Sequence, residues 1–561
     1  MLFICFSVYQ TSGQEVKKRI AVSGDAGMYA DFYSMLSDTP GAVSPRRPSA
    51  LGRLVLNASI DIKDFSMPVT LALPTAQYGV VIPPVPRIPN APFDNFRQMV
   101  KNPLNRVGIA PKYKWCQVLL GSQIPHYSEL SVGDLAVFGA GINLTPGKFR
   151  FAAFAGSSQL AIEEDTVKKI QGIYSRKIYS AKIGVGHEDS SHIYLIGSQM
   201  QDDTLSLQRR PASLMPQAGF LTSLDYRINF GKHIFLKGEL AGSAFTRDVK
   251  AQELPAFSPS LPRVIFVPRE SSRLDYATIL SLGGEWRRFG IRSTGRYYGD
   301  GFVPLGYPFM QTDRLEVTLD PRFTLFKNKV FVTGSLGQRV NNLLGIRGTT
   351  TTQTIGSANV SIQFTDQLSL TGSYTNFGFR NAIRNDTFRV EMVTVSWSIS
   401  PTYMYTGTKS IHGFSVLYAK NNFTDFNIIS GAINNNNAYN ALLSYSLALV
   451  NSPLSAGLLI SYFDNTTAVA RLRTQSLNAN AGYKFFKNKL STSLGITYAE
   501  NKIDNSTPGN QVLGMLGARY SLKKKIQFAL NGSINLYRFG NERPGISYRE
   551  NLLRTSIIYK L

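Results

Sequence analysis

Apolar and polar residues alternate one by one through segment after segment of this chain. In residues 526–537, for example, Ile526 and Phe528 fall on one face and Gln527 falls on the other. Residues 490–498 repeat the pattern. A period of two belongs to the β-strand, whose successive side chains point to opposite faces. We therefore expect a succession of strands, each with one apolar and one polar face.

The links between these segments alternate between short turns and longer polar stretches. This is the arrangement of a transmembrane barrel, which has tight turns on the periplasmic side and longer loops outside. The longest links are expected at residues 76–104, 159–175, 201–216 and 248–273. Twelve short turns are expected at residues 64–66, 112–114, 145–147, 187–191, 230–232, 288–290, 327–328, 365–367, 406–410, 451–453, 487–488 and 522–525.

The number of strands follows from the turns. Twelve short turns join twenty-four strands, a final strand at 547–561 follows the last link, and parity then requires a first strand at 19–34. The sequence thus predicts an all-β fold: a single large transmembrane antiparallel up-and-down β-barrel of about 26 strands, with 24 as the alternative. The competing fold is a soluble propeller or sandwich, but neither needs links that alternate in length.

The composition agrees with a barrel in the outer membrane. After the N-terminus there is no run of 18 or more apolar residues, so no transmembrane helix is expected. A mean hydropathy of −0.08 is what results when one residue faces lipid and the next faces water. The C-terminal strand ends at Leu561 with apolar alternation, which resembles the signal read by the outer-membrane assembly machinery. We expect that machinery and membrane lipid to be partners.

Residues 1–13 are interpreted as a signal peptide, possibly truncated at its start, and 14–561 as the barrel. Residues 2–9 are apolar, and small residues at 11–13 fit a cleavage site. A buried first strand is the alternative reading, and a lipid-anchored Cys5 is a further one that bulky Ile4 disfavours. Removal of the leader would leave Cys116 as the single thiol, so no disulfide is expected.

Two stretches carry a family resemblance. They are residues 102–115 (NPLNRVGIAPKYKW) and 138–152 (FGAGINLTPGKFRFA), and QDDT at 201–204 fits with them. Together they resemble a family of outer-membrane β-barrel proteins of Bacteroidota-type bacteria. The resemblance covers the N-terminal third and implies a barrel in the outer membrane, but it carries over no active site.

The chain is strongly basic, with a formal net charge of +24. Such a balance can indicate nucleic acid, acidic lipid or an anionic solute as partner. For a barrel, lysines and arginines at turns and water-facing positions meet lipid phosphates, so no nucleic-acid partner is expected. Five arginines at water-facing positions form a candidate basic patch in the lumen: Arg287, Arg292, Arg296, Arg322 and Arg339.

Two interpretations of this patch remain open. The simpler one is a solvated inner wall whose charges pair across strands. The sharper one is a basic constriction that attracts anionic solutes.

No motif for chemistry stands out. His187 and His192 bracket Glu188 and Asp189, but a short turn explains them and no second cluster completes a metal site. The Gly-x-Gly pair at 139–141 lies in a strand, where a dinucleotide fingerprint would need a helix. We expect no catalytic residues, no cofactor and no bound metal.

The expected function is therefore a porin-like channel or transporter for unknown solutes. About 26 strands enclose a lumen wider than that of plugged 22-stranded transporters. We expect the proline-rich links 76–104 and 248–273 to fold inward and occlude it, since proline stiffens a loop at little entropic cost. The alternative is a barrel that does not transport and acts as a surface-binding or envelope/secretion-complex scaffold.

Overall fold

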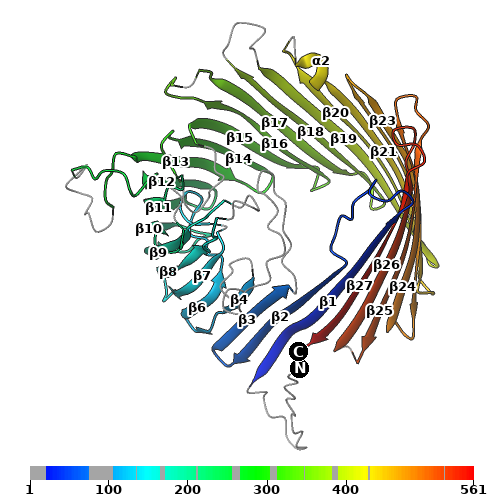
Figure 1. The fold of residues 1–561 in the computed structure, drawn as a ribbon, viewed down its shortest axis with the longest axis horizontal. Coiled ribbons are helices and arrows are strands. Elements are labelled where there is room, and N and C mark those ends of the chain that lie inside the picture. Colours follow the sequence, from blue (N-terminus) through cyan, green and yellow to red (C-terminus); the bar gives the residue numbers. More distant parts are fainter. Residues whose placement is uncertain are drawn as a thin grey trace, which may run out of the picture.

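The chain forms one closed antiparallel β-barrel (Figure 1). The computed structural model describes residues 20–74, 105–133, 135–164, 171–209, 213–255, 266–303, 312–346, 348–381, 390–427, 430–523 and 525–561. Strand β1 (Ala21–Ser37) pairs on one side with β2 (Ala50–Ile62) and on the other with the last strand, β27 (Ser547–Lys560). This last pairing joins the two ends of the sheet. No edge is then left unpaired, as a sheet in lipid requires.

Between these strands, each element pairs with its neighbours in chain order. The first group is β3 (Phe65–Pro74), β4 (Arg106–Ile109), β5 (Lys112–Tyr113), β6 (Cys116–Gln123), β7 (Val137–Leu144), β8 (Phe149–Gln159), β9 (Ser175–Gly186), β10 (His192–Asp203), β11 (Ala218–Phe230), β12 (Ile234–Thr246), β13 (Ser272–Glu285) and β14 (Phe289–Tyr298). The second group is β15 (Arg314–Leu325), β16 (Val330–Asn341), β17 (Thr351–Gln363), β18 (Leu368–Asn381), β19 (Glu391–Thr406), β20 (Ser410–Asp425), β21 (Asn436–Leu449), β22 (Leu454–Thr467), β23 (Arg471–Phe485), β24 (Leu490–Ile503), β25 (Gly509–Leu522) and β26 (Ile526–Arg538).

Two of these elements are pieces of one barrel strand. Both β4 and β5 pair with β3 and with β6, and Ala110 and Pro111 separate them. Proline has no N–H to donate to a ladder, so the strand is interrupted there. The 27 strands of the described chain therefore occupy 26 positions in the barrel, which confirms the predicted count.

The short turns lie within two residues of where the sequence predicts them. A repeated tetrapeptide, Phe-Lys-Asn-Lys, makes the turns at 326–329 and at 486–489. In both, the first three residues have φ between 50° and 71°, and the N–H of the last lysine donates to the carbonyl of the phenylalanine at 3.2 Å. Asparagine tolerates this left-handed conformation well. The same local sequence thus produces the same turn at two places in the barrel.

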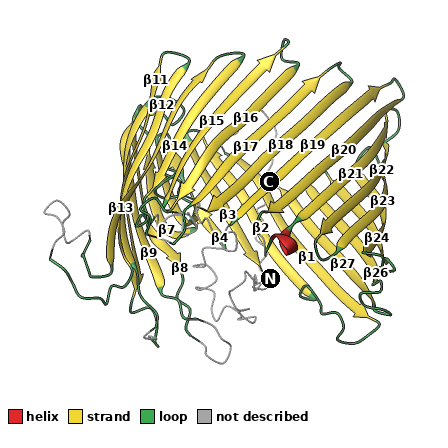
Figure 2. Cartoon of the chain, turned by 90° about the horizontal axis from the view of Figure 1, so that it is seen from above, coloured by secondary structure: helices red, strands yellow, loops and turns green. Residues whose placement is uncertain are grey.

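The strands cross the barrel obliquely, and the described longer links lie at the end opposite to the short turns (Figure 2). The short helix α2 (Gly431–Asn434) lies in the link between β20 and β21. No helix in the described part of the chain has the length and apolar character needed to cross a membrane.

Two predicted links extend into residues that the structure places in strands. Strand β10 continues to Asp203, inside the link predicted at 201–216, because its ladder with β9 runs on and Arg176 forms a two-bonded ion pair with Asp202. Strand β13 begins at Ser272, inside the link predicted at 248–273. The leader 1–13 and the link 76–104 lie outside the described residues.

Candidate functional site

The two faces of the barrel wall differ sharply in character. On β13, Leu274, Leu280 and Leu282 point outward and are about half exposed, at 48–56%. Outward leucines, isoleucines and aromatics of this kind recur on strands around the whole ring. A closed sheet with an apolar exterior satisfies its backbone internally and matches the hydrocarbon of a bilayer.

A segment of the chain folds into the lumen after β6. It comprises residues 124–136, of which 134 is not described, and we call it the inner segment. Its Tyr127 and Val132 are buried against side chains of the inner wall. A hydrogen bond from the Tyr127 N–H to the Val132 carbonyl, at 2.7 Å, closes it into a compact turn. The side chains that it covers on β7 to β10 are Val137, Phe154, Ile178, Ile196 and Met200.

The tip of the inner segment reaches further round the wall. Leu130 has no exposed surface, and it packs in a cluster with inward side chains of the neighbouring strands. Burying a leucine of this kind contributes about 1.5–3 kcal/mol. Its partners on β11 to β14 and just after β14 are Leu221, Ala241, Ala277, Ile279, Tyr298 and Phe302. We call the inner faces of β6 to β14 the covered wall.

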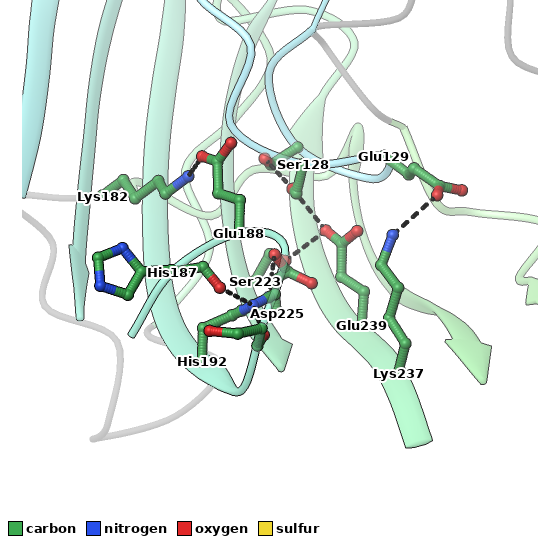
Figure 3. Close-up of polar contacts among 12 residues, drawn as sticks. Ser128, Glu129, Lys182, His187, Glu188, His192, Ser223, Asp225, Lys237 and Glu239 are labelled. Atoms are coloured by element: carbon green, nitrogen blue, oxygen red, sulfur yellow. Dashed lines mark hydrogen bonds and ion pairs between the residues drawn. The ribbon is translucent and has the colours of Figure 1, made fainter. Parts of the chain in front are cut away.

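A buried carboxylate on β12 anchors the tip (Figure 3). Glu239 is 4% exposed and accepts hydrogen bonds from the hydroxyls of Ser128 (2.6 Å) and Ser223 (2.5 Å). The backbone N–H of Leu130 lies 3.3 and 3.2 Å from its two carboxylate oxygens. A buried carboxylate needs such donors, because an unsatisfied one carries the full cost of desolvation.

A second polar contact lies beside this anchor at the surface of the lumen. Glu129 forms an ion pair with Lys237 of β12 at 3.3 Å, and both side chains are about half exposed (Figure 3). Burial raises the pKa of the Tyr127 hydroxyl above its usual range. Apolar packing, the Glu239 carboxylate and this solvated ion pair together hold the inner segment against the wall.

The opposite side of the lumen is lined differently. The inward faces of β17 to β26, which we call the open wall, carry mainly hydroxyls and amides. These groups form hydrogen bonds across strands at distances of 2.5–2.8 Å. Such bonds are possible because opposite residues on one face of an antiparallel sheet lie close together. The pairs are Ser373 with Ser398, Ser461 with Ser476, Thr474 with Asn501, and Asn478 with Thr497.

Four of the five arginines of the predicted basic patch come together. Arg292 and Arg296 lie on β14, Arg322 on β15 and Arg339 on β16, three adjacent strands. Arg287 lies apart from them in the turn between β13 and β14. Neither Arg287 nor Arg322 forms an ion pair with a residue that the structure describes.

Two carboxylates neutralise much of this patch. Glu316 lies between Arg296 (3.1 Å) and Arg339 (2.6 Å), and Asp320 lies 3.8 Å from Arg292. Pairing across strands therefore accounts for three of the five arginines. A role of the patch in attracting anions stays a prediction.

The histidine cluster at 187–192 lies at the turn between β9 and β10. His192 Nε2 lies 3.4 Å from Asp225 Oδ2, and the Nζ of Lys182 lies 3.0 Å from Glu188. The hydrogen bond from Lys182 lowers the pKa of Glu188 below its usual range. Among the described residues, no group of three or more His, Cys, Asp or Glu side chains gathers as a metal site.

Comparison with known proteins adds little to this picture. No family model matches the chain, and no curated protein matches it by sequence. Solved structures that resemble it include the P pilus usher (PapC) translocation pore, with a TM-score of 0.36, 8% identity and coverage of 96% of this chain and 99% of that one. Acinetobacter baumannii OccAB4 has a TM-score of 0.30, 13% identity and coverage of 70% and 99%. The outer membrane protein opdK from Pseudomonas aeruginosa has a TM-score of 0.31, 8% identity and coverage of 62% and 93%.

These similarities are too slight to carry an argument. The class of the protein rests on its own geometry: a closed 26-strand sheet with a lipid-compatible exterior and a polar or covered interior. The protein is an outer-membrane β-barrel.

Proposed function

We propose that this protein is a porin-like channel or transporter whose lumen the inner segment narrows from one side. The observation that carries the proposal is the contrast between the two inner walls. The covered wall is apolar under a docked segment, while the open wall presents hydroxyls and amides to water. Such groups replace part of a solute's hydration, which is the property that a passage for polar solutes needs.

The inner segment takes the occluding role that the sequence suggested for longer links. In the link 248–273, the two described ends are bonded to one another. Glu253 forms an isolated β-bridge with Arg269 and an ion pair with it at 3.0 Å. Occlusion by 76–104 and 248–273 stays a prediction. So do the signal peptide, the membership of a Bacteroidota-type barrel family and the absence of enzymatic activity.

The test is conductance of the purified barrel in a planar lipid bilayer. We expect a steady ion current, and a larger one when residues 126–132 are replaced by a glycine-serine linker of equal length. Deletion of 76–104, measured beside it, reports the separate contribution of that link. A barrel that is folded, inserted and silent in all three forms would contradict the proposal.

A scaffold role is the second candidate. The two described ends of the link 248–273 are bonded to one another, and Arg269 also donates to the Ala251 carbonyl at 2.8 Å. These bonds favour a fixed surface at the rim. Silence in the bilayer together with a partner that co-purifies, and is lost when 252–270 is shortened, would favour this role over transport.

A further inference from the structure

A cavity lies beneath the inner segment, near the turn end of β5 to β9. Its volume is about 360 Å³. The roof is the first part of the inner segment, including Pro125 and His126, and the walls are inward residues of the barrel. The cavity is therefore a product of the way the inner segment folds back along the wall.

The charges that line this cavity are predominantly positive. Lys112, Arg150 and Lys182 line it, whereas Glu188 is the single acid among its described lining residues. The Glu188 carboxylate lies 3.0 Å from Lys182, so that pair is close to neutral. No described carboxylate forms an ion pair with Lys112 or Arg150, so these two residues supply the positive field of the cavity.

Two of the cations are held in place. Arg150 donates from Nη1 to the carbonyls of Gly147 (2.8 Å) and Phe149 (2.7 Å), and from Nη2 to His187 Nδ1 (2.6 Å). A guanidinium has no acceptor, so the imidazole must accept this bond. The Lys182 ammonium lies 4.4 Å from the centre of the Tyr194 ring as well as beside Glu188. Groups fixed in this way lose little entropy when they bind a ligand.

The remaining lining offers neutral contacts for the rest of a ligand. The amides of Gln117 and Asn143 bond to one another at 3.4 Å on the wall. Trp115 and Tyr127 supply aromatic surface to the lining. A cavity of this size accepts a molecule of a few carbon atoms, and its charge favours oxyanions.

We propose that this cavity is a binding site for small organic anions that carry carboxylate or phosphate groups. The proposal deepens the proposed channel function by giving it a solute class, and it rests on that function only for passage of the solute across the membrane. Lys112 and Arg150 contact the anion, and Trp115 lies beside it.

Binding is measured by calorimetry and by tryptophan fluorescence on the barrel purified in detergent. The chain has three tryptophans, and Trp115 is the one that lines the cavity. Citrate and glycerol 3-phosphate are the two anionic probes, and glycerol is the neutral one. We expect saturable binding of at least one anion with a fluorescence change that Trp115→Phe removes, and no saturation with glycerol.

Three variants locate the site. Loss of a charge-assisted hydrogen bond weakens binding roughly tenfold or more, which we expect for Arg150→Gln and for Lys112→Gln. Lys112 is exposed, so its variant keeps the test valid if Arg150→Gln fails to fold. The matched control is Lys484→Gln, at the turn end of β23 on the open wall, which we expect to leave binding unchanged.

Equal weakening by Lys484→Gln would show a general field effect and overturn the proposal, as would saturation by glycerol or no anion binding at all. Binding is measured in detergent and conductance in a bilayer, so the two results are independent. A barrel that binds citrate but passes no current would refute transport and leave the binding site standing. A conducting barrel that binds neither anion would support transport and refute the binding site.

Discussion

The covered wall and the open wall are built from the same strand geometry, yet they carry different side chains inward. Strand β10 buries Tyr194, Ile196 and Met200 toward the lumen while Ile193 and Leu195 face outward. Strand β23 instead carries polar side chains inward, at Ser476 and at the inward residues on either side of it. The difference teaches that an apolar inner face marks the strands on which a segment of the chain itself is docked.

The largest effect is expected from the apolar contact that only the covered wall has. Leu130→Ala removes a fully buried side chain and should weaken docking of the inner segment by about 2–5 kcal/mol. Limited proteolysis should then cut within 126–133 much faster than in the unsubstituted barrel, because local opening exposes that backbone. Leu459→Ala makes the same change at an inward, partly exposed leucine of the open wall, and it should alter neither cleavage nor conductance. Equal effects of the two variants would break the comparison.

The anchor comes second. Glu239→Gln replaces two acceptor oxygens by one and brings an NH₂ group toward hydroxyls and an N–H that already donate, so docking should weaken by about 1–3 kcal/mol. Single-channel recordings should show brief openings to a higher conductance, which reflect transient release of the segment. Glu253→Gln, in the link 248–273, is the control. An unchanged current with Glu239→Gln would mean that apolar packing alone holds the segment.

A smaller effect is expected in the basic patch. Glu316→Gln removes the carboxylate between Arg296 and Arg339 and leaves both guanidinium groups without their counter-ion. The reversal potential in a salt gradient should shift toward anion selectivity, by the modest amount expected when a single negative charge is removed from the lumen. Ser398→Ala on the open wall should leave it unchanged. A shift toward cations would exclude the patch as an anion attractor.

The smallest effect concerns the pair at the turn between β9 and β10. The hydrogen bond from Lys182 lowers the pKa of Glu188, so the pair stabilises the fold above the usual value of 4.5 and its contribution is lost as pH falls through the lowered value. Glu188 is 75% exposed, which screens the interaction. Thermal unfolding measured from pH 6 down to pH 3, values that bracket roughly the ordinary carboxyl range, should show slightly less acid dependence for Glu188→Gln. A larger acid dependence in this variant would contradict the assignment.

Much of the fold is readable from the sequence because the bilayer imposes its pattern residue by residue. Alternation in 490–498 and 526–537 and the twelve short turns define the strands, and the parity of the links gives 26 of them. The break at Ala110 and Pro111 follows from the proline itself, which has no N–H to donate. The end of β10 is set by its ladder with β9 and by the ion pair of Arg176 with Asp202, which no local pattern shows.

The inner segment was not predicted, and the reason is physical. Its sequence around Leu130 and Val132 alternates like a strand, so nothing local marks it as a lumen segment. The available signal lies on the strands that it covers. The run 193–196 (Ile-Tyr-Leu-Ile) is apolar at every position, which indicates a strand covered on both faces. Likewise, the sequence predicts a basic patch of five arginines in the lumen, but it does not show that Arg287 lies apart from the others or that Glu316 and Asp320 neutralise three of them.

The central claim, that the inner segment lies against the covered wall, is tested most directly by zero-length carbodiimide coupling of the purified barrel. This reagent joins a carboxylate to an ammonium group that it contacts, and mass spectrometry of the digest identifies the linked peptides. The account predicts a link between Glu129 and Lys237, which lie 3.3 Å apart, alongside the internal control link between Lys177 and Asp203 at 3.0 Å. Recovery of the Lys177–Asp203 link without the Glu129–Lys237 link would contradict it.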